Sequence, residues 1–323
     1  MTKGLSLRAA LAILLWPAMA LAADNPAAQP PAATPPTIPS PPAPAAPIED
    51  IVGTAVDDSL RLTVPVMING KGPFDFVIDT GADRTVISQE LATRLGLPES
   101  GTAQLHSLGG SKKVSMVDID SVKVSTNVIR KVRAAALPAR NLGADGLLGI
   151  DALKGQRIVI DFVAKTMKVV SSAEPEEPAP ENTSLIIVTA RSRLGQLVMV
   201  DADANGKKIW VVVDTGAQNS VANSRLRYLL TKGARGAEVK TIEMLDVLGN
   251  RTPADYVVVS KLRIGGVGLG QAPVAFADAH PFKLFGLSRK PAMLLGIETL
   301  RVFRRVSVDF ATREVKFLLP NEP

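Results

Sequence analysis

The tetrapeptide Asp-Thr-Gly-Ala occurs twice in the chain, as Asp79-Thr80-Gly81-Ala82 and as Asp214-Thr215-Gly216-Ala217. Each copy directly follows an apolar run, Phe76-Val77-Ile78 in the first case and Val211-Val212-Val213 in the second. This pattern predicts a β-strand that runs into a tight glycine loop and presents a carboxylate there. One short motif is a weak signal, but two in matching settings indicate that two carboxylates are presented in the same way.

The similarity continues beyond the motif and indicates an internal duplication. The two motifs lie 135 positions apart, and Asn69-Gly70 and Asn205-Gly206 precede them at nearly the same distance. Gly146-Leu147-Leu148-Gly149-Ile150 matches Met293-Leu294-Leu295-Gly296-Ile297 at an offset of 147. The growing offset means that the second copy carries extra residues in its middle, which insertions confined to loops would explain.

Apolar residues alternate from Leu60 to Ile68, and Asn69-Gly70 is a preferred hairpin turn that leads to a second alternating run ending at Ile78. Short helices are predicted at Ser88–Leu95, Ile150–Leu153 and Ile297–Leu300. We therefore expect an all-β fold of two homologous lobes with few short helices.

The N-terminus has the features of a secretory signal peptide. Lys3 and Arg8 precede an apolar stretch, and Ala20-Leu21-Ala22 is a small-x-small cleavage pattern, so residues 1–22 are predicted to be removed. A membrane anchor is the alternative, but the apolar run contains Pro17 and is shorter than the roughly 20 residues needed to cross a bilayer. We expect an exported protein, most simply periplasmic, with secretion as the other possibility, and no stable membrane span after cleavage.

Composition defines two linkers and excludes several functions. Residues 23–49 are rich in Pro and Ala and are predicted to be a disordered tether; residues 172–184 form an acidic, Pro-rich linker between lobes at 50–171 and 185–320. The chain has no cysteine, which excludes cysteine catalysis. Its formal charge of +6, or +4 without the leader, comes from scattered residues, so no nucleic-acid partner is expected.

Two carboxyl groups on glycine loops can hydrolyse an amide, because one can activate water as a base while the other protonates the substrate. Two aspartates within hydrogen-bond distance cannot both ionise, and such a pair titrates with two macroscopic pKa values. Asp79 and Asp214 are therefore the predicted catalytic pair. Gly81 and Gly216 let the backbone approach closely, and Thr80 and Thr215 can hydrogen-bond across the lobe junction.

Asp79–Ile87 resembles the active-site segment of retropepsin-like aspartic proteases, and Gly146–Gly149 resembles their hydrophobic-hydrophobic-Gly element. Ala82 and Ala217 follow the retroviral pattern rather than the serine usual in pepsins. The segments Pro291–Gly296 and Val308–Phe310 are similar to bacterial exported aspartyl proteases of this group.

The resemblance covers roughly residues 52–170 and 185–319. It implies retropepsin-like or pepsin-like β-barrel lobes that form an intramolecular pseudo-dimer. It also implies a monomeric endopeptidase that acts on protein or peptide substrates without a metal or cofactor.

The same resemblance implies that a glycine turn in each lobe forms a flap over the substrate, namely Leu108-Gly109-Gly110-Ser111 in the first lobe and Leu248-Gly249-Asn250 in the second. Ordinary hairpin turns are the alternative. Asp83 sits where family members bind the substrate backbone, while Gln218 takes that place in the second lobe. The two halves of the cleft are therefore expected to differ. The substrate-binding residues implied are Asp83, Gly109, Gly110, Gln218 and Gly249.

The remaining candidates have simpler interpretations. His106 and His280 are the only histidines, and without a spaced ligand cluster they are expected to be ordinary surface or core residues rather than zinc ligands. Asp161 and Asp309 are expected to stabilise strand turns, and the Gly265-Gly266-Val267-Gly268 cluster to turn a hairpin. Trp210 is expected to be a packing residue.

Three functions fit these observations. The first is an aspartic endopeptidase, and the second is a catalytically inactive peptide-binding module of the same fold. The third is a structural envelope protein that holds a partner through its Pro-rich arm, although nothing in that arm specifies one. Retention of both aspartates favours the endopeptidase.

Overall fold

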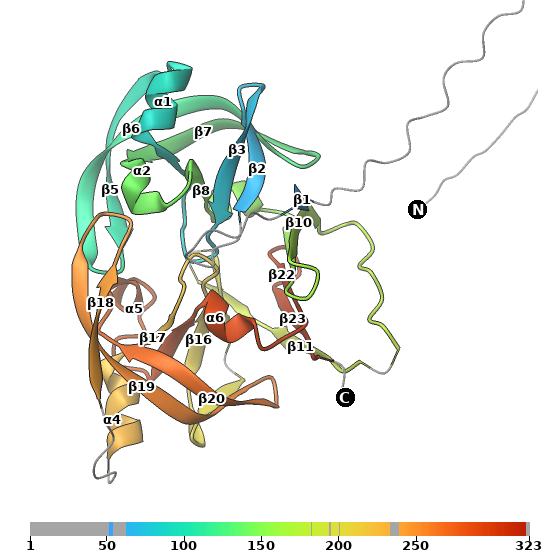
Figure 1. Cartoon of the computed structure of the whole chain (residues 1–323), viewed down its shortest axis with the longest axis vertical. Coiled ribbons are helices and arrows are strands. Elements are labelled where there is room, and N and C mark those ends of the chain that lie inside the picture. The colour runs from blue at the N-terminus through green and yellow to red at the C-terminus, as the bar shows by residue number, and fades with distance from the viewer. Residues whose placement is uncertain are drawn as a thin grey trace, which may run out of the picture. The chain divides into compact units, whose positions relative to one another are not determined.

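The computed structural model describes residues 52–53, 63–181, 183–193, 195–199, 201–232 and 239–320, all within one compact unit that extends over residues 49–323. The predicted leader and the predicted tether lie outside the described residues. The expected all-β fold is confirmed, because the described chain is mostly strand, with six short helices (Figure 1). No helix within these ranges is long and apolar enough to cross a membrane.

The first lobe is a closed barrel. Its sheet has the order β2-β3-β8-β4-β7-β6-β5, and an additional pairing of β2 with β6 closes the ring. In β2 the side chains of Val64, Val66 and Ile68 are fully buried, as the alternating sequence predicts. The strands of this lobe are β2 Thr63–Ile68, β3 Lys71–Ile78, β4 Val86–Ser88, β5 Glu99–Ser107, β6 Gly110–Val124, β7 Asn127–Leu137 and β8 Gly146–Leu148.

The second lobe repeats this arrangement. The order β3-β8-β4-β7-β6-β5 of the first lobe recurs as β16-β21-β17-β20-β19-β18, including the parallel pairing that joins β16 to β21. The strands are β12 Arg191–Arg193, β13 Gln196–Met199, β14 Ala202–Ala204, β15 Lys207–Lys208, β16 Trp210–Val213, β17 Ser220–Ala222, β18 Lys240–Leu245, β19 Arg251–Ile264, β20 Val267–Phe276 and β21 Ala292–Leu295. The predicted duplication is thus visible in the sheet topology.

A third sheet, of six strands, contains strands from both halves of the chain. Its order is β1-β10-β9-β22-β23-β11, and β9 pairs with β22 so that Ile160 lies opposite Val306. The strands are β1 Val52–Gly53, β9 Gln156–Asp161, β10 Thr166–Ser171, β11 Leu185–Thr189, β22 Arg305–Asp309 and β23 Glu314–Leu318. Because neither half completes this sheet alone, the two lobes are joined by backbone hydrogen bonds as well as by the linker.

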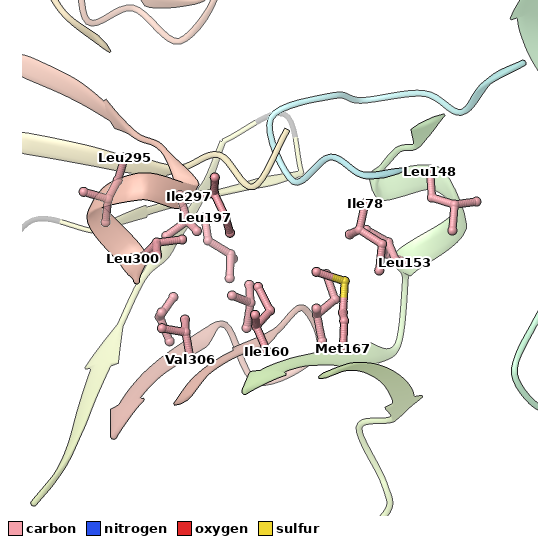
Figure 2. Close-up of a cluster of buried hydrophobic side chains, with 14 of the residues drawn as sticks. Ile78, Leu148, Leu153, Ile160, Met167, Leu197, Leu295, Ile297, Leu300 and Val306 are labelled. Atoms are coloured by element: carbon pink, nitrogen blue, oxygen red, sulfur yellow. The ribbon is translucent and has the colours of Figure 1, made fainter. Parts of the chain in front are cut away.

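The largest hydrophobic cluster also extends over both halves. Figure 2 shows Ile160, Met167 and Val306 of the shared sheet facing side chains of both lobes, among them Leu153 and Leu197. Ile78, the residue before the first Asp-Thr-Gly motif, and Leu295, in the strand that pairs with β16, belong to the same cluster. The strands that carry the two motifs are therefore anchored in one continuous core.

The three predicted helices are present as α1 Gln89–Leu95, α3 Ile150–Leu153 and α6 Ile297–Leu300. Ser88 caps the start of α1 by accepting a hydrogen bond from the Leu91 amide, and Gly96 ends it in the left-handed conformation. Three further helices were not predicted: α2 Ala139–Leu142, α4 Ser224–Thr231 and α5 His280–Leu284.

The predicted turns are also present. Asn69 and Gly70 both have positive φ, and so do Asn205 and Gly206 at the corresponding hairpin of the second lobe. Gly265 and Gly266 turn the hairpin between β19 and β20. The side chains of Asp161 and Asp309 each accept two backbone amide hydrogen bonds in the turns that follow their strands, as expected.

The acidic segment between the halves is held against the shared sheet. The Arg157 guanidinium donates to the Glu174 carbonyl at 3.0 Å, and Lys316 Nζ lies 2.5 Å from a carboxylate oxygen of Glu176. Arg305 contacts the Glu177 carboxylate at 3.3 Å. The carboxylates of Glu176 and Glu177 thus pair with basic residues of the sheet. The domain boundaries drawn from the sequence stay a prediction.

Candidate active site

Both Asp-Thr-Gly loops begin where a central strand ends. The Asp79 amide donates to the Leu148 carbonyl at 3.0 Å, and the Asp214 amide donates to the Leu295 carbonyl at 3.0 Å. Each loop is therefore still tied to the neighbouring parallel strand, β8 or β21, when it leaves the sheet. The apolar residues before each aspartate are buried, which fixes the direction in which the loop emerges.

Thr80 and Thr215 join the two loops through four reciprocal hydrogen bonds. Thr80 Oγ1 accepts from the Thr215 amide at 3.1 Å and donates to the Val213 carbonyl at 2.8 Å. Thr215 Oγ1 in turn accepts from the Thr80 amide at 3.2 Å and donates to the Ile78 carbonyl at 2.7 Å. Both threonines are buried, so water does not compete for these bonds. The predicted hydrogen bonds across the lobe junction are confirmed.

The backbone of each loop holds its own carboxylate. Asp79 Oδ1 accepts from the amides of Gly81 at 2.9 Å and Ala82 at 3.0 Å. Asp214 Oδ1 accepts from the Ala217 amide at 3.1 Å. Amide donors aimed at one oxygen fix the plane of the carboxyl group and leave its other oxygen for a further partner.

Each carboxyl group also lies directly against the glycine of the opposite loop. A methyl group on Gly81 would come within 2.7 Å of Asp214 Cγ, and one on Gly216 within 2.2 Å of Asp79 Cγ. Real Cβ atoms do not approach other atoms so closely, so only glycine fits at either position. The glycines were predicted as loop support, and their specific role is to let the two loops cross at the two carboxyl groups.

The two aspartates titrate as a pair. Burial raises the pKa of Asp214 to about 8, and the negative charge of Asp79 and a hydrogen bond with the Asp79 carboxyl act in the same direction. The backbone amides of Ala217 and Gly216 oppose this shift without cancelling it. The close approach of two carboxyl groups therefore opposes ionisation of both, and the pair holds one proton at neutral pH.

The two predicted flaps contact each other. The first lies at the turn of the β5–β6 hairpin and the second at the turn of the β18–β19 hairpin. In Figure 1 the end of β5 lies beside the end of β18. Asp246 Oδ2 accepts from Ser107 Oγ at 2.6 Å and from the Gly109 amide at 2.9 Å. We call these three residues the flap contact. Their hydrogen bonds tie the tip of one lobe to the tip of the other.

Asp246 is held from both sides. Within its own turn it accepts from the amides of Leu248 and Asn250 and from Asn250 Nδ2 at 2.8–3.0 Å. Burial alone would raise the pKa of Asp246, but the hydrogen bonds from Ser107, Asn250 and the Gly109 amide outweigh it, so the pKa lies below its ordinary value. The carboxylate therefore stays ionised, and the flap contact intact, at moderately acidic pH.

The structure assigns different surroundings to the predicted substrate-binding residues. Gly109 lies against the second flap, and Gly249, with a φ of +82°, lies near the side chain of Asn141. Gly110 begins β6 with a φ of +149°. Asp83 is exposed at the first loop, while Gln218 is half-buried and its carbonyl accepts from the Glu298 amide. Their role toward substrate stays a prediction.

His106 and His280 come together across the lobes, which the sequence did not suggest. His106 Nδ1 lies 2.8 Å from His280 Nε2, and the rings stack with centroids 4.9 Å apart. Burial lowers the pKa of His280, and the charges of His106 and Lys283 act in the same direction. Within the part of the chain that the structure describes, no group of three or more His, Cys, Asp or Glu side chains could hold a metal ion.

Trp210 begins β16 and packs against a smaller hydrophobic cluster of the second lobe that includes Val212, Phe282 and Leu294. Lys290 Nζ lies 4.1 Å from the centroid of the Trp210 ring. The expected packing role is confirmed. Asp246, in contrast, was missed. Its position before Leu248-Gly249-Asn250 could have suggested a turn-forming aspartate, but its partners on the first lobe are 137 and 139 positions away.

Comparison with known protein families agrees with this geometry. A family model described as aspartyl protease matches residues 64–152 and 200–299, one region in each lobe. The chain therefore belongs to the retropepsin-like aspartyl protease family, with two copies of the domain in tandem. A search among curated proteins found no match.

The crossing of the loops can be tested by adding one methyl group. Gly216→Ala should destabilise the protein by about 1–3 kcal/mol, because the new Cβ would overlap the Asp79 carboxyl group. The measurement is urea unfolding followed by circular dichroism. Gly268→Ala is the matched control, since a Cβ there meets nothing within 4 Å. Equal stability of the two variants would contradict the crossing.

The flap contact can be tested by hydrogen exchange. In Asp246→Asn the Gly109 amide should exchange at least about tenfold faster, because a hydrogen bond to a charged acceptor contributes about 1.5–3 kcal/mol. In the unaltered protein, protection of this amide should persist above the ordinary aspartate pKa of about 4 and be lost as pH falls through the lowered pKa of Asp246.

Asp203→Asn is the control for this experiment, because Asp203 accepts from Gly206 in another turn of the second lobe. If the Gly109 amide exchanges at the same rate in Asp246→Asn as in the unaltered protein, the two flaps are not joined through Asp246.

Proposed function

We propose that the protein is an aspartic endopeptidase that hydrolyses peptide bonds by means of a water molecule activated between Asp79 and Asp214. The observation that carries this proposal is that two equivalent loops cross so closely that each carboxyl group lies against the glycine of the opposite loop, and that the charge of Asp79 raises the pKa of Asp214. A plain structural loop does not need a second carboxyl group beside it, and burial of such a pair costs free energy. Membership of the aspartyl protease family supports the same conclusion.

The raised pKa of Asp214 supports different roles for the two carboxyl groups. Asp214 carries the shared proton, because burial and the neighbouring Asp79 raise its pKa to about 8. Backbone amides of the same loop donate to each carboxyl group, Gly81 and Ala82 to Asp79 and Gly216 and Ala217 to Asp214, so the raised pKa of Asp214 is the feature on which the assignment of roles rests. We therefore infer that Asp79 is the general base and Asp214 the general acid.

In the first step, Asp79 removes a proton from the water, and the oxygen of that water bonds to the carbonyl carbon of the substrate. Asp214 gives its proton to the carbonyl oxygen, so a neutral tetrahedral diol forms and the proton changes sides of the pair. In the second step, the protonated Asp79 donates to the amide nitrogen while Asp214 takes back a proton from the diol. The carbon–nitrogen bond then breaks to give an acid and an amine.

The hydrogen bonds between the flaps restrict which substrates can enter the site. An extended peptide chain can lie beneath paired hairpins, whereas a folded domain requires the hairpins to separate, so we infer a preference for unfolded or extended segments. We also propose that a single chain is active as a monomer, because each lobe supplies one member of the pair. Export to the periplasm remains part of the proposal on the sequence of residues 1–22 alone.

A catalytically inactive peptide-binding module is the second candidate. The flap contact is compatible with this candidate, because it joins the two hairpins over a bound peptide whether or not that peptide is cleaved. The two proposals differ in one respect: an inactive module binds peptides and yields no products.

Cleavage of a denatured protein or a peptide library between pH 3 and pH 9 tests the proposal. The unaltered protein should cleave, and Asp79→Asn and Asp214→Asn should each lose about a hundredfold or more in kcat/KM, as expected for loss of general acid or base catalysis. Activity should fall as pH rises through about 8, where the shared proton is lost.

Asp120→Asn is the matched control, because Asp120 is an exposed aspartate of β6. Peptide binding without products in the unaltered protein would favour the inactive module. If one of the two asparagine variants kept full activity, the pair within one chain would not be the catalytic centre.

A further inference from the structure

Gln196, in β13 of the second lobe, reaches the active-site loop of the first lobe. Its Nε2 donates to the Gly81 carbonyl at 3.1 Å, across a sequence separation of 115 residues. The side chain is only 2% exposed, and within the described part of the chain its Oε1 is buried without a hydrogen-bond partner. A buried amide with an unpartnered oxygen costs free energy that a leucine would not. The local packing therefore gives no reason for glutamine here.

The hydrogen bond ends on the peptide group that holds Asp79. The Gly81 carbonyl and the Ala82 amide belong to one peptide unit, and that amide donates to Asp79 Oδ1 at 3.0 Å. A donor on the carbonyl side polarises a peptide group and strengthens the bond that its N–H makes, by about 10–30% for each added bond. Gln196, the peptide unit and the Asp79 carboxylate thus form one hydrogen-bonded chain.

The second loop differs at this point. The Ala217 amide donates to Asp214 Oδ1 at 3.1 Å, but no side chain among the described residues donates to the Gly216 carbonyl. Among the described residues, the duplicated loops are therefore alike in their backbone hydrogen bonds and differ in side-chain support. The supported loop is the one with Asp79.

The position of Gln196 is well fixed. Its neighbour Leu197 lies in the core shared by both lobes (Figure 2). Val198 and Met199 pair with β16, the strand that leads to Asp214. The same strand that supports the second aspartate thus holds a donor against the loop of the first.

We propose that Gln196 is a positioning residue of the aspartate pair, which stabilises ionised Asp79 through the Gly81–Ala82 peptide unit and so directs the shared proton to Asp214. The proposal deepens the proposed function and rests on it for its catalytic meaning, but the effect on the two carboxyl groups exists whether or not the protein cleaves peptides. The pKa of Asp214, raised to about 8, agrees with this direction.

The test is an NMR titration of the protein labelled with ¹³C at the aspartate carboxyl carbons. Signals of Asp79 and Asp214 are assigned from their asparagine variants. In Gln196→Met and Gln196→Leu, which fill the site without a donor, the lower titration midpoint of the pair should rise by about half a pH unit. Where cleavage is measurable, the acidic limb of the kcat/KM profile should move by the same amount.

Leu197→Ala is the control, because it loosens the same buried strand without touching the Gly81 carbonyl. An unchanged midpoint in both Gln196 variants, or an equal shift in Leu197→Ala, would overturn the proposal. If neither Gln196 variant folds, the through-hydrogen-bond coupling between Gln196 Nε2 and the Gly81 carbonyl carbon in the unaltered protein decides: its presence supports the proposal and its absence overturns it. A protein that titrates as expected but cleaves nothing would refute the proposed function and leave this inference standing.

Discussion

The reciprocal hydrogen bonds of Thr80 and Thr215 are the constraint on which the site depends. Each hydroxyl bonds to the backbone of the opposite loop, so neither loop can shift without breaking bonds in both lobes. The glycines that follow allow the loops to approach until each carboxyl group lies against the other loop. The closeness of Asp79 and Asp214, and with it the sharing of one proton, is a consequence of this crossing.

In a duplicated chain, equivalent positions of the two halves can carry different residues, whereas two identical subunits cannot differ in this way. The shared six-stranded sheet and the continuous core hold the two lobes together, so differences between them need not weaken the assembly. The two halves differ in this way at two positions near the site. Gln196 donates to the first loop, with no corresponding side-chain donor to the second loop among the residues that the structure describes, and Asp246 lies on the flap of the second lobe. An unsymmetrical pair suits a reaction in which one carboxyl group begins as base and the other as acid.

Much of the fold and the centre of the site could be predicted from the sequence, because the signals there are local. The two Asp-Thr-Gly motifs, the Asn-Gly turns and the cap of α1 at Ser88 each depend on a few adjacent residues. The contacts between lobes could not be predicted. His106 meets His280 across 174 positions, and Gln196 meets Gly81 across 115, and no periodicity records such pairings. Helices α2, α4 and α5 were also missed.

The central claim is that the two carboxyl groups of one chain share one proton. Neutron diffraction from deuterated crystals grown near neutral pD tests it most directly, because deuterium between the carboxyl oxygens is visible. We expect a single deuterium between the two groups, bonded to Asp214, with the Thr80 and Thr215 hydroxyls donating across the junction. A deuterium on each carboxyl group, none on either, or oxygens too far apart to share one would contradict it.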